Sequence, residues 1–277
     1  MYVGMLTGPF GGESLENVLD FAESASISHL EVIAHPGSKH IDPATLTATR
    51  IKEIRCALED RILEISSLAY YTCDLTCPGK MKAVQAHTIK TIDAAAKLGV
   101  PVVCMLSGFP APGMSKLETI QKVLPKAFKP ILAHARKKGI KIALENYFET
   151  CLQGIDTFEA MFEAIPDDHF GLNYDPSHLF HQECDHLLPL SMFKHRIFHT
   201  HAKDTLVNRA LRAKVGIYAG GWWRYVIPGL GNIDWGEYIS HLRMNGYNGV
   251  LSIEHEDCAQ GREEGFLHGA WFLEQFC

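Results

Sequence analysis

Short apolar runs alternate along the chain with longer segments in which apolar residues recur every three or four positions. The short runs are typical of buried strands, and the longer segments are typical of amphipathic helices. The pattern predicts strands at about residues 2–6, 29–34, 62–68, 100–106, 140–144, 170–174, 196–200 and 250–253. It predicts helices at about residues 13–24, 43–59, 80–98, 116–138, 155–165, 181–190, 235–245 and 265–276.

Strands that alternate with helices imply a parallel sheet with helical crossovers, so the fold class is α/β. Eight such units that close on themselves form a (β/α)8 TIM barrel, which needs roughly 250 residues. The chain has 277 residues, so we expect a single TIM-barrel domain over residues 1–277. The open alternative is a doubly wound sheet, but the segment GPFGG at 8–12 lacks the glycine spacing of a dinucleotide-binding turn.

Composition narrows the classes of protein that the barrel can belong to. The net charge of -6 makes the chain a poor candidate for nucleic-acid binding, which depends on basic surface. No apolar run approaches the length of a membrane span, and the N-terminal residues do not form a secretory signal. The eight cysteines are scattered, with no C-x-x-C pair. We therefore expect a cytoplasmic protein with reduced thiols and with no membrane or nucleic-acid partner.

The last four predicted strands each end in a residue type that binds metals. TIM barrels carry their chemistry at these carboxyl ends. The four residues are Glu145, Asp175, His201 and Glu254. Alone, each has a simpler explanation: an aspartate before a proline, for example, is typical of a helix N-cap. Together, three carboxylates at one barrel mouth would repel one another unless a cation lay between them. We therefore predict one divalent metal ion, and this ligand set suits Mn, Co, Mg or Zn.

Other polar residues lie near the same end of the predicted barrel. Lys203 and Asp204 follow His201 directly, so we expect them to contact substrate or to orient the metal ligand. His35 ends the second predicted strand and is a further candidate for substrate binding, although a structural histidine is an equal alternative. Glu31 lies within that strand and is placed to point into the barrel.

The stretch from residue 205 to 233 is long for a connection in a compact domain. Such loops are often lids or binding loops. It contains Trp222, Trp223, Arg224 and Tyr225. Aromatic rings stack on sugars and arginine binds hydroxyl groups or phosphate, and we select Trp222 and Arg224 as the candidates for substrate binding. The alternative is a loop that packs on its own barrel or on a second subunit.

Several segments around these residues resemble one known group of proteins. They are ALEN around Glu145, NYDPSH at 173–178, HTHAKD at 199–204, SIEHED at 252–257 and IPGLGNIDW at 227–235. The chain is similar in these segments to the xylose-isomerase-like TIM-barrel superfamily. Its members include ketose 3-epimerases, hydroxypyruvate isomerase, inosose dehydratase and the endonuclease IV type of repair enzyme.

The resemblance implies roles for individual residues. The epimerases of this group bind their metal through a Glu, an Asp, a His and a second Glu, which correspond to the four residues named above. It implies that Glu145 and Glu254 are also the catalytic residues that exchange the substrate proton, and that His178 contacts substrate. The arginine that ketose epimerases carry after the strand-seven histidine has no match at the same offset, although Arg209 lies nearby.

The resemblance also implies the activity. We expect a divalent-metal-dependent sugar isomerase or epimerase that removes a proton next to a carbonyl and passes through an enediolate. The alternative is a metal-dependent lyase or dehydratase on a keto-sugar or keto-inositol. An endonuclease is less well supported, because residues 68–71 and 106–108 offer no histidine for a trinuclear site. The expected partner is a small carbohydrate, and a homodimer or homotetramer is expected by analogy.

Overall fold

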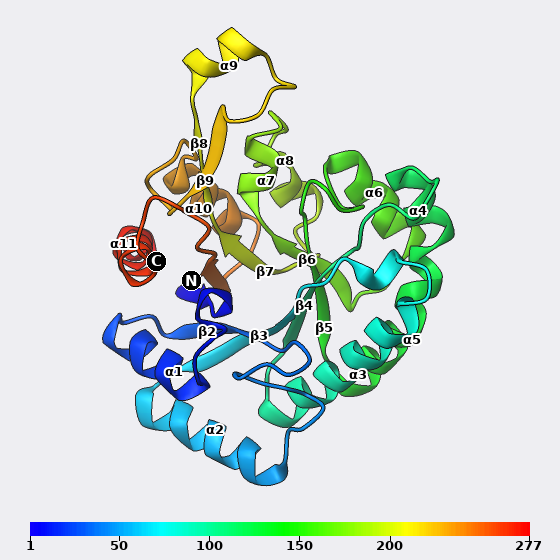
Figure 1. The fold of residues 1–277 in the computed structure, drawn as a ribbon, viewed down its shortest axis with the longest axis vertical. Helices are drawn as coiled ribbons and strands as arrows, with labels where there is room; N and C mark the ends of the chain where they lie inside the picture. The colour runs from blue at the N-terminus through cyan, green and yellow to red at the C-terminus, as the bar shows by residue number, and fades with distance from the viewer.

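The computed structural model describes residues 1–277, and eight parallel strands in it close into a barrel (Figure 1). The order around the barrel is β1-β10-β7-β6-β5-β4-β3-β2. The strands are β1 (Tyr2–Leu6), β2 (His29–Ile33), β3 (Glu64–Tyr70), β4 (Val102–Leu106), β5 (Lys141–Glu145), β6 (Phe170–Tyr174), β7 (Ile197–Ala202) and β10 (Val250–Ile253). This closed barrel with flanking helices confirms the predicted TIM-barrel fold.

Helices surround the barrel and cover its outer face (Figure 1). They are α1 (Leu15–Ser24), α2 (Ala48–Arg61), α3 (Met81–Leu98), α4 (Lys116–Lys122), α5 (Leu124–Lys138), α6 (Ile155–Ala164), α7 (Pro176–Phe180), α8 (Leu188–Met192), α10 (Trp235–Met244) and α11 (Arg262–Glu274), with short 3-10 turns at Gly8–Phe10 and Asp74–Thr76. Leu15, Leu19 and Phe128 are among the apolar side chains that these helices bury against the strands. No helix of the chain has both the length and the apolar character needed to cross a bilayer.

Three predicted boundaries differ from the structure for local backbone reasons. The second helix begins at Ala48 rather than near residue 43, because the Thr47 side chain caps it by accepting from the backbone N–H of Arg50. The third strand begins at Glu64 rather than Ile62, because Ile62 ends α2 in the left-handed conformation (φ 56°) and its side chain is 88% exposed. The predicted helix at 116–138 is two helices, α4 and α5, which meet at Val123. Pro125 has no backbone N–H to continue the helix, so the break falls just before it.

The predicted helix at 181–190 is wrong. The chain instead forms α7 directly after β6, turns, and begins α8 at Leu188. Pro176 occupies the first turn of α7, where a missing N–H costs nothing and the fixed φ suits a helix. The aspartate–proline pair therefore starts the helix earlier than the apolar periodicity indicates.

The long connection after β7 is an ordered hairpin rather than an irregular loop. Strands β8 (Asp204–Val207) and β9 (Trp223–Val226) pair antiparallel, and α9 (Arg209–Val215) lies between them. Figure 1 shows this hairpin extending away from the barrel with α9 at its tip. Because β8 follows β7 after one residue, the hairpin base lies at the carboxyl end of the barrel, where the site is expected.

The close contact of β6 with β7 predicts a sensitive glycine. A Cβ at Gly171 would lie 2.1 Å from the carbonyl oxygen of Arg196 and 2.6 Å from the ring of Phe198. Gly171→Ala should therefore lower the free energy of unfolding by about 1–3 kcal/mol or more, because a backbone oxygen cannot move aside. Thermal unfolding measures this, with Gly12→Ala as the control, since a Cβ there meets nothing within 4 Å. Equal melting temperatures for the two variants would contradict the packing.

Candidate metal centre

The four predicted ligands converge at the carboxyl mouth of the barrel. Glu145 ends β5, Asp175 follows β6, His201 lies in β7, and Glu254 follows β10. One ligand atom from each lies within 4.8 Å of all the others. His201 Nδ1 is 3.0 Å from Glu254 Oε2, 3.5 Å from Glu145 Oε1 and 3.9 Å from Asp175 Oδ2. Four neighbouring parallel strands bring their ends together, so residues far apart in sequence form one cluster.

Asp175 is both a helix cap and a member of the cluster. Its Oδ1 accepts a hydrogen bond from the backbone N–H of Ser177 at 2.8 Å, which caps α7. Asn146 fixes its backbone from both sides, since the side chain accepts from Asp175 N and donates to Asp175 O. The second oxygen, Oδ2, stays directed at the cluster. One oxygen of Asp175 therefore caps the helix, and the other remains available to a metal ion.

Two buried atoms of the cluster lack hydrogen bonds. These are Asp175 Oδ2 and His201 Nδ1, on side chains that are fully buried. Lys203 Nζ lies 3.2 Å from Asp175 Oδ2, an ion pair by distance, but its direction does not make a hydrogen bond. Buried polar atoms without partners are costly. Oxygen and imidazole donors that converge in this way fit a divalent cation of intermediate hardness.

Lys203 supplies positive charge inside the cluster. Its side chain is 1% exposed, and Nζ lies 2.6 Å from Glu254 Oε2 and 3.2 Å from Glu256 Oε2. Burial lowers the pKa of Lys203, but Asp175, Glu254 and Glu256 outweigh burial and hold it well above its usual value. A buried ammonium with these partners stays charged.

The pKa values of the two most buried carboxyls in the cluster shift downward, opposite to the shift of Lys203. Burial alone raises the pKa of Glu145 and Asp175. His201 and His178 outweigh burial for Glu145, and Lys203 outweighs it for Asp175, so both carboxyls have pKa values below their usual range. Burial raises the pKa of the neighbouring Glu256. The two innermost carboxylates are therefore ionised and available as ligands.

A cavity of about 450 Å³ opens directly onto this cluster. Its wall includes Glu145 and Glu254 from the predicted ligand set, and His178 and Lys203 from the predicted substrate-binding set. His178 Nε2 lies 3.2 Å from Glu145 Oε1. The remaining lining residues, which sequence reasoning did not select, are Tyr71, Leu106, Tyr147, Phe148, Trp223, Tyr225 and Glu256.

The hairpin contributes a different pair of residues from the pair predicted. Trp223 and Tyr225 line the cavity, whereas Trp222 and Arg224 do not. Neighbouring residues of a strand point to opposite faces, so within β9 Trp223 and Tyr225 face the site and Arg224 faces away, while Trp222 precedes the strand. Arg224 instead pairs with Asp257. Sequence could find the aromatic run but not its register, which comes from the pairing of β9 with β8.

Two other predicted substrate-binding residues also lie outside the cavity lining. His35 packs edge-to-face on Tyr70, with ring centroids 5.5 Å apart, and burial lowers its pKa. Asp204 accepts from the indole N–H of Trp235 at 2.9 Å and from four backbone N–H groups, those of Thr205, Gly229, Gly231 and Ile233. Asp204 therefore organises the turn between β9 and α10, and it has no contact with the cluster.

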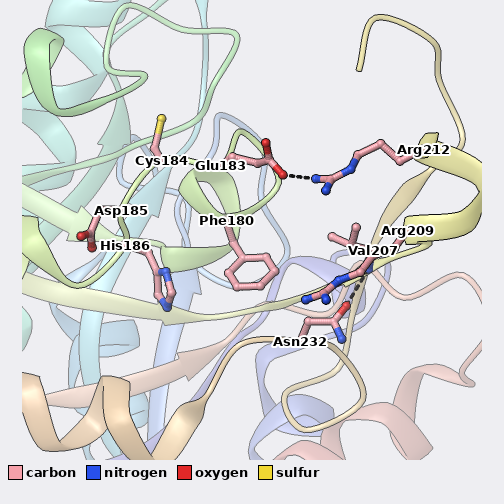
Figure 2. A pocket seen from close by; sticks show the side chains of 9 residues that line it. All are labelled: Phe180, Glu183, Cys184, Asp185, His186, Val207, Arg209, Arg212 and Asn232. Atoms are coloured by element: carbon pink, nitrogen blue, oxygen red, sulfur yellow. Dashed lines mark hydrogen bonds and ion pairs between the residues drawn. The ribbon is translucent and has the colours of Figure 1, made fainter. Parts of the chain in front are cut away.

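A second hollow of about 500 Å³ lies between the hairpin and the turn that follows α7 (Figure 2). Phe180, His186 and Asn232 are among its lining residues, and Arg212 pairs with Glu183 across it. Arg209 lines this hollow and not the metal-centre cavity. The two cavities share no lining residue, so Arg209 is not placed to take the role of the ketose-epimerase arginine.

Comparison with known families gives one match over nearly the whole chain. A family model described as "Xylose isomerase-like TIM barrel" matches residues 19–276. YfiH of Bacillus subtilis (strain 168), described as uncharacterized, is 29% identical, with 99% of each chain covered. The inosose dehydratase of Clostridium perfringens (strain ATCC 13124) is 25% identical, with 74% of each chain covered.

Solved structures agree with the fold. The IolI protein with a bound zinc atom has a TM-score of 0.76 at 17% identity, covering 100% of this chain and 99% of that one. A D-tagatose 3-epimerase-like protein has a TM-score of 0.76 at 19% identity, covering 100% and 97%. The probable 3-DHS dehydratase AsbF of Bacillus anthracis has a TM-score of 0.79 at 15% identity, covering 99% of both chains. At these identities the likeness is one of fold.

The cluster predicts metal binding that depends on its carboxylates. The purified protein should carry or take up about one divalent ion per chain, because four donors converge on one point. Glu145→Gln with Glu254→Gln should remove it, since two anionic ligands become neutral amides. Elemental mass spectrometry measures the content after incubation with Mn, Co, Mg or Zn. Glu263→Gln with Glu274→Gln is the control, with the same charge change on exposed residues of α11. Equal metal in both double variants would contradict the assignment.

The position of Asp204 predicts a role in stability. Asp204→Asn puts an N–H₂ group among five donors, so the free energy of unfolding should fall by about 2–4 kcal/mol. Folded protein should retain its metal, because Asp204 does not touch the cluster. Denaturant unfolding with metal analysis measures both quantities. Asp20→Asn on the surface is the control, and unchanged stability with lost metal in Asp204→Asn would reverse the assignment.

Proposed function

Since the chain belongs to the xylose isomerase-like TIM barrel family, we propose that it is a divalent-metal-dependent isomerase or epimerase of a small carbohydrate. The observation that carries the proposal is the pair Glu145 and Glu254 on the wall of one cavity, both within the cluster of possible metal ligands. Two bases that face one substrate are what proton removal and return require. The net charge of -6 disfavours nucleic acid as the substrate.

The cavity walls support a polyhydroxylated substrate. Tyr147, Phe148, Trp223 and Tyr225 provide aromatic surface that suits the C–H faces of a sugar. Glu256, His178 and Lys203 provide charged and hydrogen-bonding groups for hydroxyls and a carbonyl. A volume of about 450 Å³ fits a small-molecule site.

In the proposed reaction, one glutamate removes the proton from the carbon next to the substrate carbonyl. A bound divalent cation supplies Lewis acidity, which polarises that carbonyl and makes the neighbouring C–H more acidic. The pair of electrons from the C–H bond passes into an enediolate of the substrate. If the second glutamate returns a proton to the opposite face of the same carbon, the product is an epimer. Return to the adjacent carbon gives the aldose–ketose isomer.

Neighbouring residues prepare the two bases. His178 is held between Glu145 and the Tyr225 hydroxyl, which lies 2.6 Å from His178 Nδ1. Lys203 Nζ lies 2.6 Å from Glu254 Oε2 and 4.5 Å from the centre of the Tyr225 ring. These contacts hold both carboxylates at the cavity wall and bring Tyr225 of the hairpin into the same wall.

The buried ammonium of Lys203 and one relative favour a second candidate, a lyase that acts on a keto-sugar or keto-inositol. Loss of a β-hydroxyl needs an acid near the leaving oxygen, and the buried ammonium of Lys203 lines the cavity. The inosose dehydratase of Clostridium perfringens is similar over most of its length. Both reactions begin with the same proton removal, so they differ only in how the enediolate decays.

Incubation of metal-loaded protein with ketoses, aldoses and keto-inositols in D₂O separates these candidates. We expect an isomerase or epimerase to add one deuterium without loss of water, because the removed proton exchanges with solvent. Mass spectrometry and NMR of the recovered substrate measure this. A product lighter by one water identifies the lyase. No exchange and no product with any compound in the panel would contradict both.

Single variants test the two proposed bases. Glu145→Gln and Glu254→Gln should each lower kcat by roughly 10²–10⁴-fold, because an amide cannot accept the proton. Metal content of each single variant is measured in parallel, so that lost base and lost metal can be told apart. Glu263→Gln on α11 is the control, and it should keep the wild-type rate.

A further inference from the structure

Glu31 is a fully buried carboxylate inside the barrel, and it has no role in the proposed reaction. It lies in β2, and the pairing of β2 with β3 shifts register between Leu30 and Glu31. Such irregularities re-aim a side chain. Here Glu31 points across the interior to His201, and Glu31 Oε2 lies 3.0 Å from His201 Nε2. His201 thus has one ring nitrogen toward the metal cluster and the other toward Glu31.

Two further side chains hold Glu31 in this position. The Tyr71 hydroxyl donates to Glu31 Oε1, and the Ser252 hydroxyl donates to Glu31 Oε2 at 2.8 Å. With His201, Glu31 has three donors from three different strands or strand ends. A buried carboxylate needs such partners. The arrangement therefore fixes the carboxylate as an acceptor aimed at the imidazole.

Two other side chains approach the same ring nitrogen, Asn173 and Tyr71. The Tyr71 hydroxyl lies 3.1 Å from His201 Nε2, but its proton is donated to Glu31 Oε1, so Asn173 is the rival donor. Its Nδ2 lies 2.9 Å from His201 Nε2, but also donates to the Tyr71 hydroxyl at 2.8 Å. Two arrangements are possible: Nε2 donates to Glu31, or Nε2 accepts from Asn173. Glu31 already acts as the acceptor for the Tyr71 and Ser252 hydroxyls, and a carboxylate acceptor forms a stronger hydrogen bond than a neutral group. Without a proton on Nε2, its lone pair would face the Glu31 carboxylate at 3.0 Å, so the first arrangement is favoured.

We infer that Glu31 is a positioning residue that, when a metal ion is bound among Glu145, Asp175 and Glu254, keeps the proton of His201 on Nε2 and so leaves the lone pair of Nδ1 for the ion. The inference rests on the proposed metal-dependent function and deepens it. Metal-binding histidines commonly donate their second N–H to a carboxylate, which sets the tautomer and makes the ligand nitrogen more basic. Loss of the carboxylate removes both effects without removing a ligand.

The experiment compares metal binding by wild type and Glu31→Gln. Co²⁺ is titrated into metal-free folded protein by calorimetry, and the visible absorption of the bound Co²⁺ reports the ligand field of His201. We expect the Kd to rise by roughly 10–100-fold in Glu31→Gln, with an altered Co²⁺ spectrum. Glu64→Gln is the control, because its carboxylate is 78% exposed and the charge change is the same. Its Kd and spectrum should equal those of wild type.

Each other outcome has a definite meaning. Wild-type Kd and spectrum in Glu31→Gln overturn the inference and leave the proposed function intact. No Co²⁺ binding by wild type overturns the proposed function and the inference with it. Glu31, Cys104 and His199 also lie close enough to hold an ion. Two ions per wild-type chain and one in Glu31→Gln would therefore make Glu31 a ligand and overturn the positioning role.

A second variant covers the case in which Glu31→Gln does not fold. Ser252→Ala removes one hydrogen bond to Glu31 Oε2. It leaves the backbone pairing of Ser252 with His201 across β10 and β7 in place, and the lost hydroxyl makes no hydrogen bond to His201. The same titration should give a smaller rise in Kd and a spectral change of the same kind. An unchanged Kd and spectrum in Ser252→Ala, with Glu31→Gln unfolded, would show that the contact is purely structural and would overturn the inference.

Discussion

The repulsion among buried carboxylates at the barrel mouth is the constraint on which the rest of the site depends. Glu145, Asp175 and Glu254 converge within a few ångströms, and all are wholly or mostly buried. Like charges so close, and largely out of water, require compensation. Lys203, the residue directly after β7, supplies part of it. A divalent cation between the carboxylates would supply the rest, so electrostatic balance and catalysis call for the same ion.

A layer of hydrogen-bonded polar side chains below this cluster holds His201 in one orientation. The Tyr71 and Ser252 hydroxyls donate to Glu31, and Glu31 contacts Nε2 of His201, the ring nitrogen turned away from the cluster. TIM barrels are usually filled by branched apolar residues. This barrel departs from that rule under the metal cluster, and there the interior side chains form hydrogen bonds rather than apolar packing. A rigid ligand set is the physical gain.

The hairpin above the cluster completes the site from the opposite side. Tyr225 reaches His178, and Trp223 stacks on His181 with ring centroids 3.9 Å apart. Proton transfer next to a carbonyl proceeds best in a site that excludes water, where fixed charges act strongly. In the proposed function, the residues below the cluster would position a metal ion, and the hairpin residues above it would contact the substrate. Related barrels can therefore share one metal cluster and differ in the reaction that follows.

Much of this protein follows from the sequence alone. The alternation of apolar runs and helical segments determined the barrel, because each strand and its covering helix carry their own periodicity. The polar residue at each strand end indicated Glu145, Asp175, His201 and Glu254, since parallel strands present these ends together. The failures at Ile62, Val123 and residues 181–190 came from backbone conformation and proline, which local periodicity does not record.

Only the tertiary structure decided which neighbouring side chains join the cluster. Trp223 and Tyr225 replace Trp222 and Arg224 because the register of β9 against β8 sets the face of each residue. Asp204 follows the cluster in sequence yet turns away, because the N–H groups of residues 229–235 converge on it. Sequence determined which strands carry chemistry, since periodicity is local. Contacts between distant segments determined which side chains face it, because side-chain direction depends on pairings that no local pattern contains.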